Sequence, residues 1–277
     1  MSCKFHQHIS KSENLTIFTA LKQNFMNFDL IVVGSGPGGY VAAIRASQLG
    51  MNVAVIEKEH VGGICLNWGC IPTKALLKSA NVFEYINHAA DYGITVGNAK
   101  AEFPNIIKRS RDVANGMSKG INFLFKKNKI TLIEGTATLT KNKSVDVKDA
   151  SGKVTNYTAK NIIIATGGRP KELPNLKIDG SKIIEYRKAM SMETQPKKLI
   201  VVGAGAIGVE FAYFYNSIGT EVTIVEFIEQ GLLPREDAEI SKELTKIFNK
   251  KGIKVLANTG VEKVDISGSE CKVLVKN

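Results

Sequence analysis

The sequence predicts an α/β fold built from two similar units. The first observation is a repeat in which an apolar run, a glycine-rich turn, a helical stretch, a second apolar run and an acidic residue occur twice, 169 residues apart. The second is the length of 277 residues, which suffices for two domains. The third is an ordinary globular composition, with 44% hydrophobic and 23% charged residues, which argues against wholesale disorder.

The first copy of the repeat covers residues 30–57 and reads as strand, glycine turn, helix and strand. Gly34 allows a tight turn, Gly36 lets the backbone approach a pyrophosphate, and Gly39 lets the helix pack closely on the strand. The helix that follows would direct its unpaired N–H groups at phosphates. Glu57 ends the second strand, where its carboxylate can accept hydrogen bonds from ribose hydroxyls.

The second copy covers residues 199–226, with Gly203, Gly205, Gly208 and Glu226 at the same offsets. A lone glycine pattern of this kind is weak evidence, but here all five parts occur in order twice, so we predict two nucleotide sites. A carboxylate at Glu226 repels the 2′-phosphate of NADP, and the three residues after it supply no arginine to receive that phosphate. NAD is therefore favoured at the second site.

Two cysteines, Cys65 and Cys70, are separated by four residues in a glycine-containing loop. Pro72 indicates the opening of a helix, and Lys74 lies one turn after Cys70 on the same helical face. The start of a helix and a nearby ammonium both favour a thiolate, so the pair is suited to redox chemistry.

Three plainer interpretations of the pair compete with a redox role. A structural disulfide is disfavoured in a reducing cytoplasm. A zinc site needs two further ligands at suitable spacing, which the chain does not offer, so no metal is expected. Two unrelated buried thiols would not need the surrounding glycine, proline and lysine. A redox-active pair is the favoured interpretation.

Charge and hydropathy limit the partners. Lys and Arg number 37 against 26 Asp and Glu, a net charge of +11, but the excess is spread along the chain. No aromatic stacking platform accompanies the basic residues, so no nucleic acid is expected. No run of about 18 apolar residues exists, so no membrane span is expected. Residues 1–25 lack the features of a secretory signal, which favours a cytoplasmic location.

The middle of the chain is expected to contain one long helix and then strands. The stretch 103–129 is predicted to be helical, and strands alternate with turns over 130–165. The apolar residues expected on the inner face of the helix are Ile106, Ile107, Val113, Met117, Ile121 and Phe125, and the basic residues expected to point largely outward are Lys108, Arg109, Arg111, Lys119, Lys126 and Lys127.

With these motifs the chain resembles the class I pyridine nucleotide-disulfide oxidoreductases, which depend on a flavin, and within them the dihydrolipoamide dehydrogenase branch. The residues that carry the resemblance are 34–40, 62–74, 164–170 and 203–210, and the similarity runs from Met26 to the last residue. The resemblance implies two Rossmann-like domains. Residues 1–25 would be an N-terminal extension, expected to be disordered, 26–172 the FAD-binding domain and 173–277 a truncated NAD-binding domain.

The resemblance also assigns site residues. Contacts with FAD are implied for Gly34, Gly36, Gly38, Gly39, Glu57, Lys74, Gly135, Thr166, Gly167 and Gly168. Contacts with NAD are implied for Gly203, Gly205, Ala206, Ile207, Gly208, Glu226 and Val261. Catalytic roles are implied for Cys65, Cys70, Lys74 and Glu210, with Glu210 as the partner of Lys74 across the flavin. An acid merely favoured in the first turn of a helix is the plainer alternative for Glu210.

The activity that the resemblance implies is oxidation of protein-bound dihydrolipoamide with reduction of NAD. Dihydrolipoamide would attack Cys65, and Cys70 would pass two electrons to the flavin. The implied partners are the lipoyl domain of a 2-oxo acid dehydrogenase complex and, for the full-length family, a second copy of the chain.

The chain departs from the family at its C-terminal end. The second nucleotide fold is expected to be incomplete, and the dimerisation domain with its His-Glu acid/base pair is not present. We therefore expect a fragment that acts with a complementary C-terminal chain. The alternatives are another FAD disulfide reductase, of the glutathione or mercuric type, and a non-catalytic nucleotide-binding fragment.

Overall fold

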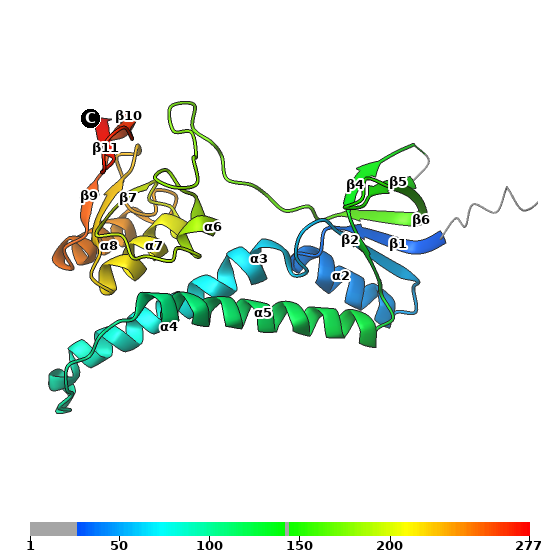
Figure 1. Ribbon diagram of the computed structural model, residues 1–277, viewed down its shortest axis with the longest axis horizontal. Coiled ribbons are helices and arrows are strands. Elements are labelled where there is room, and N and C mark those ends of the chain that lie inside the picture. Colours follow the sequence, from blue (N-terminus) through cyan, green and yellow to red (C-terminus); the bar gives the residue numbers. More distant parts are fainter. Residues whose placement is uncertain (1–26, 142–143) are drawn as a thin grey trace, which may run out of the picture. The chain divides into compact units, whose positions relative to one another are not determined.

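The computed structural model describes residues 27–141 and 144–277, which form two compact units (Figure 1). The first unit consists of residues 27–59 and 124–166, and the second of residues 60–123 and 167–277. The expectation for residues 1–25 concerns residues outside this part of the chain, and the predicted domain limits stay a prediction. Within the described ranges, no helix combines the length and apolar character needed to cross a bilayer.

The first unit contains a six-stranded mixed sheet in the order β3-β2-β1-β6-β5-β4. Its strands are β1 (Asn27–Val33), β2 (Val53–Glu57), β3 (Thr131–Glu134), β4 (Thr136–Leu139), β5 (Ser144–Lys148) and β6 (Val154–Ile164). The first four in the spatial order are parallel, and β5 and β4 add antiparallel pairs. Helix α2 (Pro37–Gln48) connects β1 to β2 and completes the predicted βαβ unit.

Apolar side chains of the central strands fill the core of the first unit. Ile31 and Val32 of β1 and Ala54 and Val55 of β2 are fully buried, as expected of parallel strands covered on both faces. The Gly34 N–H donates to the Ile56 carbonyl at 2.8 Å, so the glycine turn begins directly at the end of β1. This placement puts the turn at the carboxyl edge of the sheet, where nucleotides bind in folds of this type.

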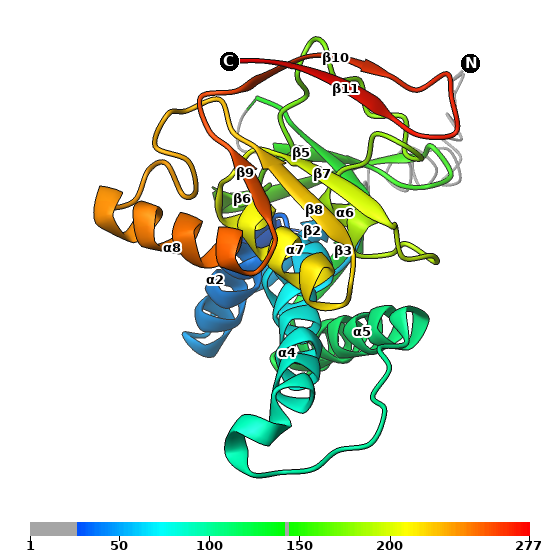
Figure 2. The same ribbon diagram turned by 90° about the vertical axis from the view of Figure 1, so that its left-hand side faces the viewer.

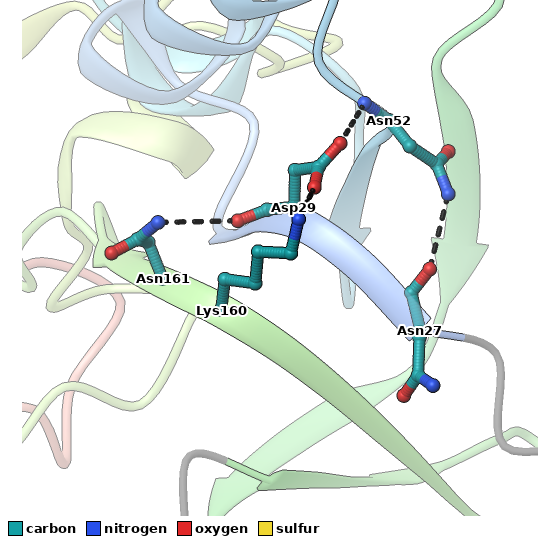
Figure 3. Close-up of polar contacts among 5 residues, drawn as sticks. All are labelled: Asn27, Asp29, Asn52, Lys160 and Asn161. Atoms are coloured by element: carbon teal, nitrogen blue, oxygen red, sulfur yellow. Dashed lines mark hydrogen bonds and ion pairs between the residues drawn. The ribbon is translucent and has the colours of Figure 1, made fainter.

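Polar side chains fix the opposite end of β1 (Figure 3). The Asp29 carboxylate accepts from the Asn52 N–H at 2.9 Å and lies 2.7 Å from the Lys160 Nζ. The Asn52 side chain donates to the Asn27 carbonyl at 3.1 Å. The hydrogen bond from Lys160 is the main cause of a lowered Asp29 pKa. These contacts join β1 to β6 and to the turn before β2, which fixes the register of the central strands.

The second unit contains a three-stranded parallel sheet, an antiparallel ribbon and most of the helices (Figure 2). The sheet consists of β7 (Lys198–Val202), β8 (Glu221–Val225) and β9 (Lys254–Leu256), and the ribbon of β10 (Gly260–Asp265) and β11 (Lys272–Lys276). The helices are α3 (Gly63–Trp68), α4 (Cys70–Asn87), η1 (Ala89–Tyr92), α6 (Tyr186–Ala189), α7 (Ala206–Ser217) and α8 (Ala238–Lys250). The succession β7, α7, β8 is the second predicted βαβ unit.

Helix α7 carries the core of the second unit. Phe214 and Tyr215 are almost fully buried, and the Tyr215 hydroxyl donates to the Ala189 carbonyl at 2.6 Å. Helix α4 packs against α7, and Leu76 of α4 belongs to the same apolar cluster. The helix that begins at Cys70 is therefore held against the second βαβ unit.

The long helix predicted at 103–129 is α5 (Phe103–Lys127), but its inner face differs from the expectation. Val113 and Met117, which were expected inside, are 37% and 44% exposed, whereas Ser110 and Ala114 are buried. The small residues occupy the positions that continue the spacing of Phe103 and Ile107, and their size permits close packing. A prediction based on hydrophobicity alone was therefore wrong for Val113 and Met117 on the inner face of α5.

Candidate functional site

The turn after β1 requires glycine at two positions. Gly34 has φ +99°, and a Cβ there would lie 2.3 Å from the Ala165 carbonyl oxygen. A Cβ on Gly39, inside α2, would lie 1.9 Å from the Gly34 carbonyl oxygen. Real Cβ atoms do not approach backbone oxygens so closely, because van der Waals contact begins beyond 3 Å. The helix can thus start against the strand only with glycine at position 39.

Glu57 accepts four hydrogen bonds, two of which come from this turn. Its Oε2 accepts from the Ser35 N–H at 2.9 Å and from the Ser35 hydroxyl at 2.6 Å. Its Oε1 accepts from the backbone N–H groups of Lys58 and Glu59 at 2.8 and 2.9 Å. The carboxylate is therefore fixed at the end of β2. Sequence reasoning missed Ser35, although a hydroxyl between two glycines of the motif was a signal for it.

The second turn repeats the backbone contacts of the first. The Gly203 N–H donates to the Val225 carbonyl at 2.9 Å, and a Cβ on Gly208 would lie 2.1 Å from the Gly203 carbonyl oxygen. Glu226 accepts from the N–H of Ala204 at 2.6 Å. Because Ala204 stands where the first copy has serine, Glu226 receives no hydroxyl bond from this position. The repeat seen in the sequence is thus also a repeat of backbone hydrogen bonds.

Both turns fit a pyrophosphate. Helices α2 and α7 begin after Gly36 and Gly205 in extended backbone, and in the described part of the chain no side chain caps either N-terminus. Their first N–H groups and positive dipole ends therefore face the turn, where an anion binds favourably. A Cβ added to Gly205 would meet nothing within 4 Å, so the space that a ligand needs is open there.

This open space gives a direct test of the second nucleotide site. Gly205→Ala is expected to leave the fold intact, because Gly205 has φ −69° and room for a methyl group. The methyl group would stand where the backbone meets the pyrophosphate, and a steric cost of about 1–3 kcal/mol corresponds to a loss of NADH affinity of roughly tenfold to a hundredfold. Fluorescence titration with NADH measures this loss of affinity. Gly120→Ala, an exposed glycine of α5, is the control, and equal NADH affinity in both variants would contradict the assignment.

Two further residues assigned to FAD lie at the first turn. The Gly135 N–H donates to the Glu57 carbonyl at 2.9 Å, and a Cβ at Gly135 would lie 2.6 Å from the Lys148 carbonyl oxygen. The Thr166 Cα lies 3.2 Å from the Cβ position of Gly34. The structure therefore brings Gly34, Glu57, Gly135 and Thr166 to one edge of the first sheet.

The cysteines lie on two consecutive helices, whereas the sequence indicated a loop that leads into a helix. Cys65 is in α3, Cys70 is the first residue of α4, and only Gly69 separates the helices. Gly69 adopts φ −142° and ψ −118°, which breaks the helix between the two thiols. A Cβ there would lie 3.1 Å from the Ile64 carbonyl oxygen, so the break is also tightly packed. The helix therefore starts two residues before Pro72.

The two thiols differ in their surroundings. Cys70 is exposed, whereas Cys65 is partly buried. Burial, followed by a hydrogen bond with Cys70, raises the pKa of the Cys65 thiol to about 11. The Cys65 thiol is therefore protonated at neutral pH, and a thiolate at this position is a poor leaving group.

Lys74 and Glu210 form an ion pair between α4 and α7. The Lys74 side chain is 64% exposed and that of Glu210 31%, so the pair by itself contributes at most about 1 kcal/mol to stability. Its position one turn after Cys70 places an ammonium close to the start of the cysteine helix. The role of the pair beside a flavin stays a prediction.

Two basic residues that were expected to point outward from α5 turn back toward the cysteine helices. Arg109 donates to the Ala75 carbonyl at 2.8 Å, and Arg111 donates to the Asn67 carbonyl at 2.7 Å. Long guanidinium side chains can reach across a helix surface, so their position in the sequence pattern did not reveal these contacts. Asn67 and Arg111 are functional candidates that sequence reasoning missed.

The remaining assigned residues are less closely grouped. Ala206, Ile207 and Gly208 form the first turn of α7, and Ile207 is 60% exposed. Val261 in β10 accepts a hydrogen bond from the Asn175 side chain. Gly167 and Gly168 are exposed and follow Thr166. Within residues 27–141 and 144–277, no group of three His, Cys, Asp or Glu side chains is placed to hold a metal.

Comparison with known proteins gives the relatives of the chain. The dihydrolipoyl dehydrogenase of Rhizobium etli is 48% identical over 254 residues, which cover 86% of this chain and 53% of the relative. That of Zymomonas mobilis is 47% identical, over 89% of this chain and 55% of the relative. The chain spans about half the length of these curated relatives.

Two solved structures have a similar fold. LpdA from Mycobacterium tuberculosis superposes with a TM-score of 0.81 at 26% identity, over 90% of this chain and 55% of that one. The flavoprotein disulfide reductase RclA from Escherichia coli, solved as a Cu(II) complex, gives a TM-score of 0.78 at 26% identity, over 90% of this chain and 53% of that one. Residues 28–277 match the pyridine nucleotide-disulphide oxidoreductase family, and the chain therefore belongs to it.

Proposed function

We propose that this chain takes part in the oxidation of protein-bound dihydrolipoamide to lipoamide, with reduction of NAD, through a Cys65–Cys70 disulfide. The observation that carries the proposal is the helix break at Gly69, which sets Cys65 and Cys70 next to each other beside Lys74. Two glycine turns with fitted carboxylates support the use of two nucleotides.

The difference between the thiols gives the direction of attack. A dihydrolipoamide thiolate attacks the Cys65 sulfur, the Cys65–Cys70 bond breaks, and Cys70 leaves as a thiolate. Attack at Cys70 would instead expel Cys65, whose raised pKa makes it the poorer leaving group. The start of α4 stabilises negative charge on Cys70 through the helix dipole.

The second half of the exchange releases the product. The free thiol of the lipoyl group attacks the lipoyl sulfur that is bonded to Cys65. The lipoyl S–S bond forms, which gives lipoamide, and Cys65 leaves as a thiolate that takes up a proton. The reduced pair then holds two electrons, and bound FAD supplies the route by which they pass as a hydride to NAD. Lys74, paired with Glu210, keeps a positive charge one turn from the Cys70 sulfur.

The residues proposed to hold FAD are those at the first turn, from Gly34 to Gly39, with Glu57, Gly135 and Thr166. The residues proposed to hold NAD are Gly203 to Gly208 and Glu226. Glu226 is 7% exposed and accepts from the Ile228 N–H at 2.9 Å. A buried carboxylate at this point disfavours a 2′-phosphate, which supports NAD over NADP and counts against reductases of the glutathione type.

The proposed partners follow from the substrate. They are the lipoyl domain of a 2-oxo acid dehydrogenase complex and a second copy of the chain. A cytoplasmic location stays a prediction.

Cys70→Ser tests the cysteine assignment. FAD is expected to stay bound, and the long-wavelength absorbance that a thiolate gives beside a flavin is expected to vanish, because serine forms no such anion at neutral pH. Visible spectra during anaerobic reduction with dihydrolipoamide measure both. Cys271→Ser is the control. It removes a partly buried thiol directly before β11, and this variant is expected to keep the long-wavelength band. A band that persists in Cys70→Ser would overturn the assignment.

A further inference from the structure

Trp68 lies between the two cysteines, at the end of α3, and is the only tryptophan of the chain. Its ring contacts two guanidinium groups: the Arg111 Cζ lies 4.7 Å from the ring centroid and the Arg187 Cζ 5.8 Å. The buried indole N–H has no hydrogen-bond partner in the described part of the chain. The ring is therefore held by stacking and cation–π attraction rather than by a hydrogen bond.

Arg111 joins this ring to two other parts of the second unit. Its Nη1 donates to the Asn67 carbonyl at 2.7 Å, and its Nη2 lies 3.9 Å from the Met190 sulfur. Burial lowers the pKa of the Arg111 guanidinium, so bringing this side chain out of water has a free-energy cost. Its contacts with the Asn67 carbonyl and the Trp68 ring work against that cost, although its Nε is buried without a hydrogen-bond partner in the described part of the chain.

Asn67 links the Arg111 contact at the end of α3 to the start of the same helix. Its side-chain amide donates to the carbonyls of Val61 at 3.0 Å and Gly63 at 2.9 Å, which lie at the start of the helix. Its own carbonyl, at the end of the helix, receives the Arg111 bond. Both ends of the six-residue helix that carries Cys65 are thus held through one residue.

We propose that Arg111 is a positioning residue for the cysteine pair. By holding the Asn67 carbonyl and the Trp68 ring, it fixes the helix break at Gly69, keeps the Cys65 sulfur in reach of the Cys70 sulfur, and so favours the disulfide over the dithiol. The physical reason is effective concentration, because a fixed pair loses little conformational freedom when the bond forms. The inference rests on the proposed function, since it assigns a supporting residue to the same pair.

Equilibration of the whole chain with glutathione measures this preference. Glutathione disulfide oxidises the pair: the Cys65 and Cys70 thiols lose two protons and two electrons, one S–S bond forms between them, and two molecules of glutathione thiol are released. Samples at graded glutathione ratios are quenched with acid, alkylated, and mapped by mass spectrometry, which scores Cys65 and Cys70 separately from the other cysteines.

Arg111→Lys is the main variant, because lysine keeps the charge but lacks the planar fork that can bond a carbonyl and stack on a ring at once. We expect its disulfide equilibrium constant to fall about tenfold, which is about 30 mV for a two-electron couple. Trp68→Phe, which keeps an aromatic ring, is expected to show a smaller fall in the same direction. Arg109→Lys is the matched control, since Arg109 donates to the Ala75 carbonyl and the Ser79 hydroxyl of α4, and it should match the unmodified chain.

A spectroscopic measurement separates positioning from general stability. Trp68 fluorescence reports on this site alone, and in Arg111→Lys we expect acrylamide to quench it at least twofold more efficiently, with a thermal midpoint close to that of Arg109→Lys. Equilibrium constants of Arg111→Lys and Trp68→Phe within twofold of the unmodified chain would overturn the inference. If the unmodified pair forms no intramolecular disulfide at any glutathione ratio, the proposed function itself fails, which is a different outcome.

Discussion

Gly39→Ala is expected to destabilise the first unit by about 3 kcal/mol, at the upper end of the range for overpacking. The added Cβ would lie 1.9 Å from the Gly34 carbonyl oxygen, which belongs to backbone and cannot swing aside as a flexible side chain would. Relief requires α2 to move away from β1, which also displaces the N–H groups proposed to hold the pyrophosphate. We therefore expect FAD binding to be lost together with stability.

Gly38→Ala is the matched control for this change in stability. Gly38 is the neighbouring residue in the same helix, it is exposed, and its Cβ would meet nothing within 4 Å. An alanine there is expected to be neutral or to stabilise by about 0.5 kcal/mol, because it lowers the entropy of the unfolded chain. Thermal or urea unfolding compares the two variants, and equal stability would show that the close approach of helix and strand is misjudged.

Glu226→Gln is expected to weaken NADH binding about tenfold to a hundredfold. The carboxylate is buried and accepts from the N–H groups of Ala204 and Ile228, so its position is fixed before a ribose arrives. Replacing the charged acceptor by an amide removes charge-assisted hydrogen bonds of about 1.5–3 kcal/mol each while keeping the shape of the side chain. NADH titration gives the change in affinity, and flavin absorbance shows whether FAD is retained.

Glu229→Gln removes the same charge at an exposed position three residues later and serves as the control. It is expected to bind NADH as the unmodified chain does. If Glu226→Gln lowered the occupancy of FAD as much as the affinity for NADH, the assignment of the two turns to two different nucleotides would be wrong.

The glycine repeat is the part of the fold that could be read from the sequence in most detail. The offsets of Gly34, Gly39 and Glu57 recur at Gly203, Gly208 and Glu226, and two backbone hydrogen bonds of the first turn recur with them. These features are local, because turns, close helix starts and strand ends depend on residues within one βαβ unit. A local constraint of this kind leaves few residue types possible at each position, so the sequence alone is enough to predict the turn.

The support around the cysteine pair could not be read in the same way. Arg111 lies 44 residues from Asn67, and its spacing on α5 placed it among the outward basic residues. Val113 and Met117 were misplaced on the same helix, because hydrophobicity does not tell which of two adjacent faces meets a neighbour. Helix orientation depends on packing between elements, which the pattern of one element does not contain.

The sequence by itself therefore determined the two glycine turns and the family to which the chain belongs, and it predicted a redox role for the cysteine pair. Only the tertiary structure decided that α3 and α4 are separate helices broken at Gly69 and that Arg111 holds Asn67 and Trp68. The physical reason is the range of the interactions. Backbone conformation is set by neighbours in the chain, whereas the contacts of long charged side chains are set by whichever helix packs beside them.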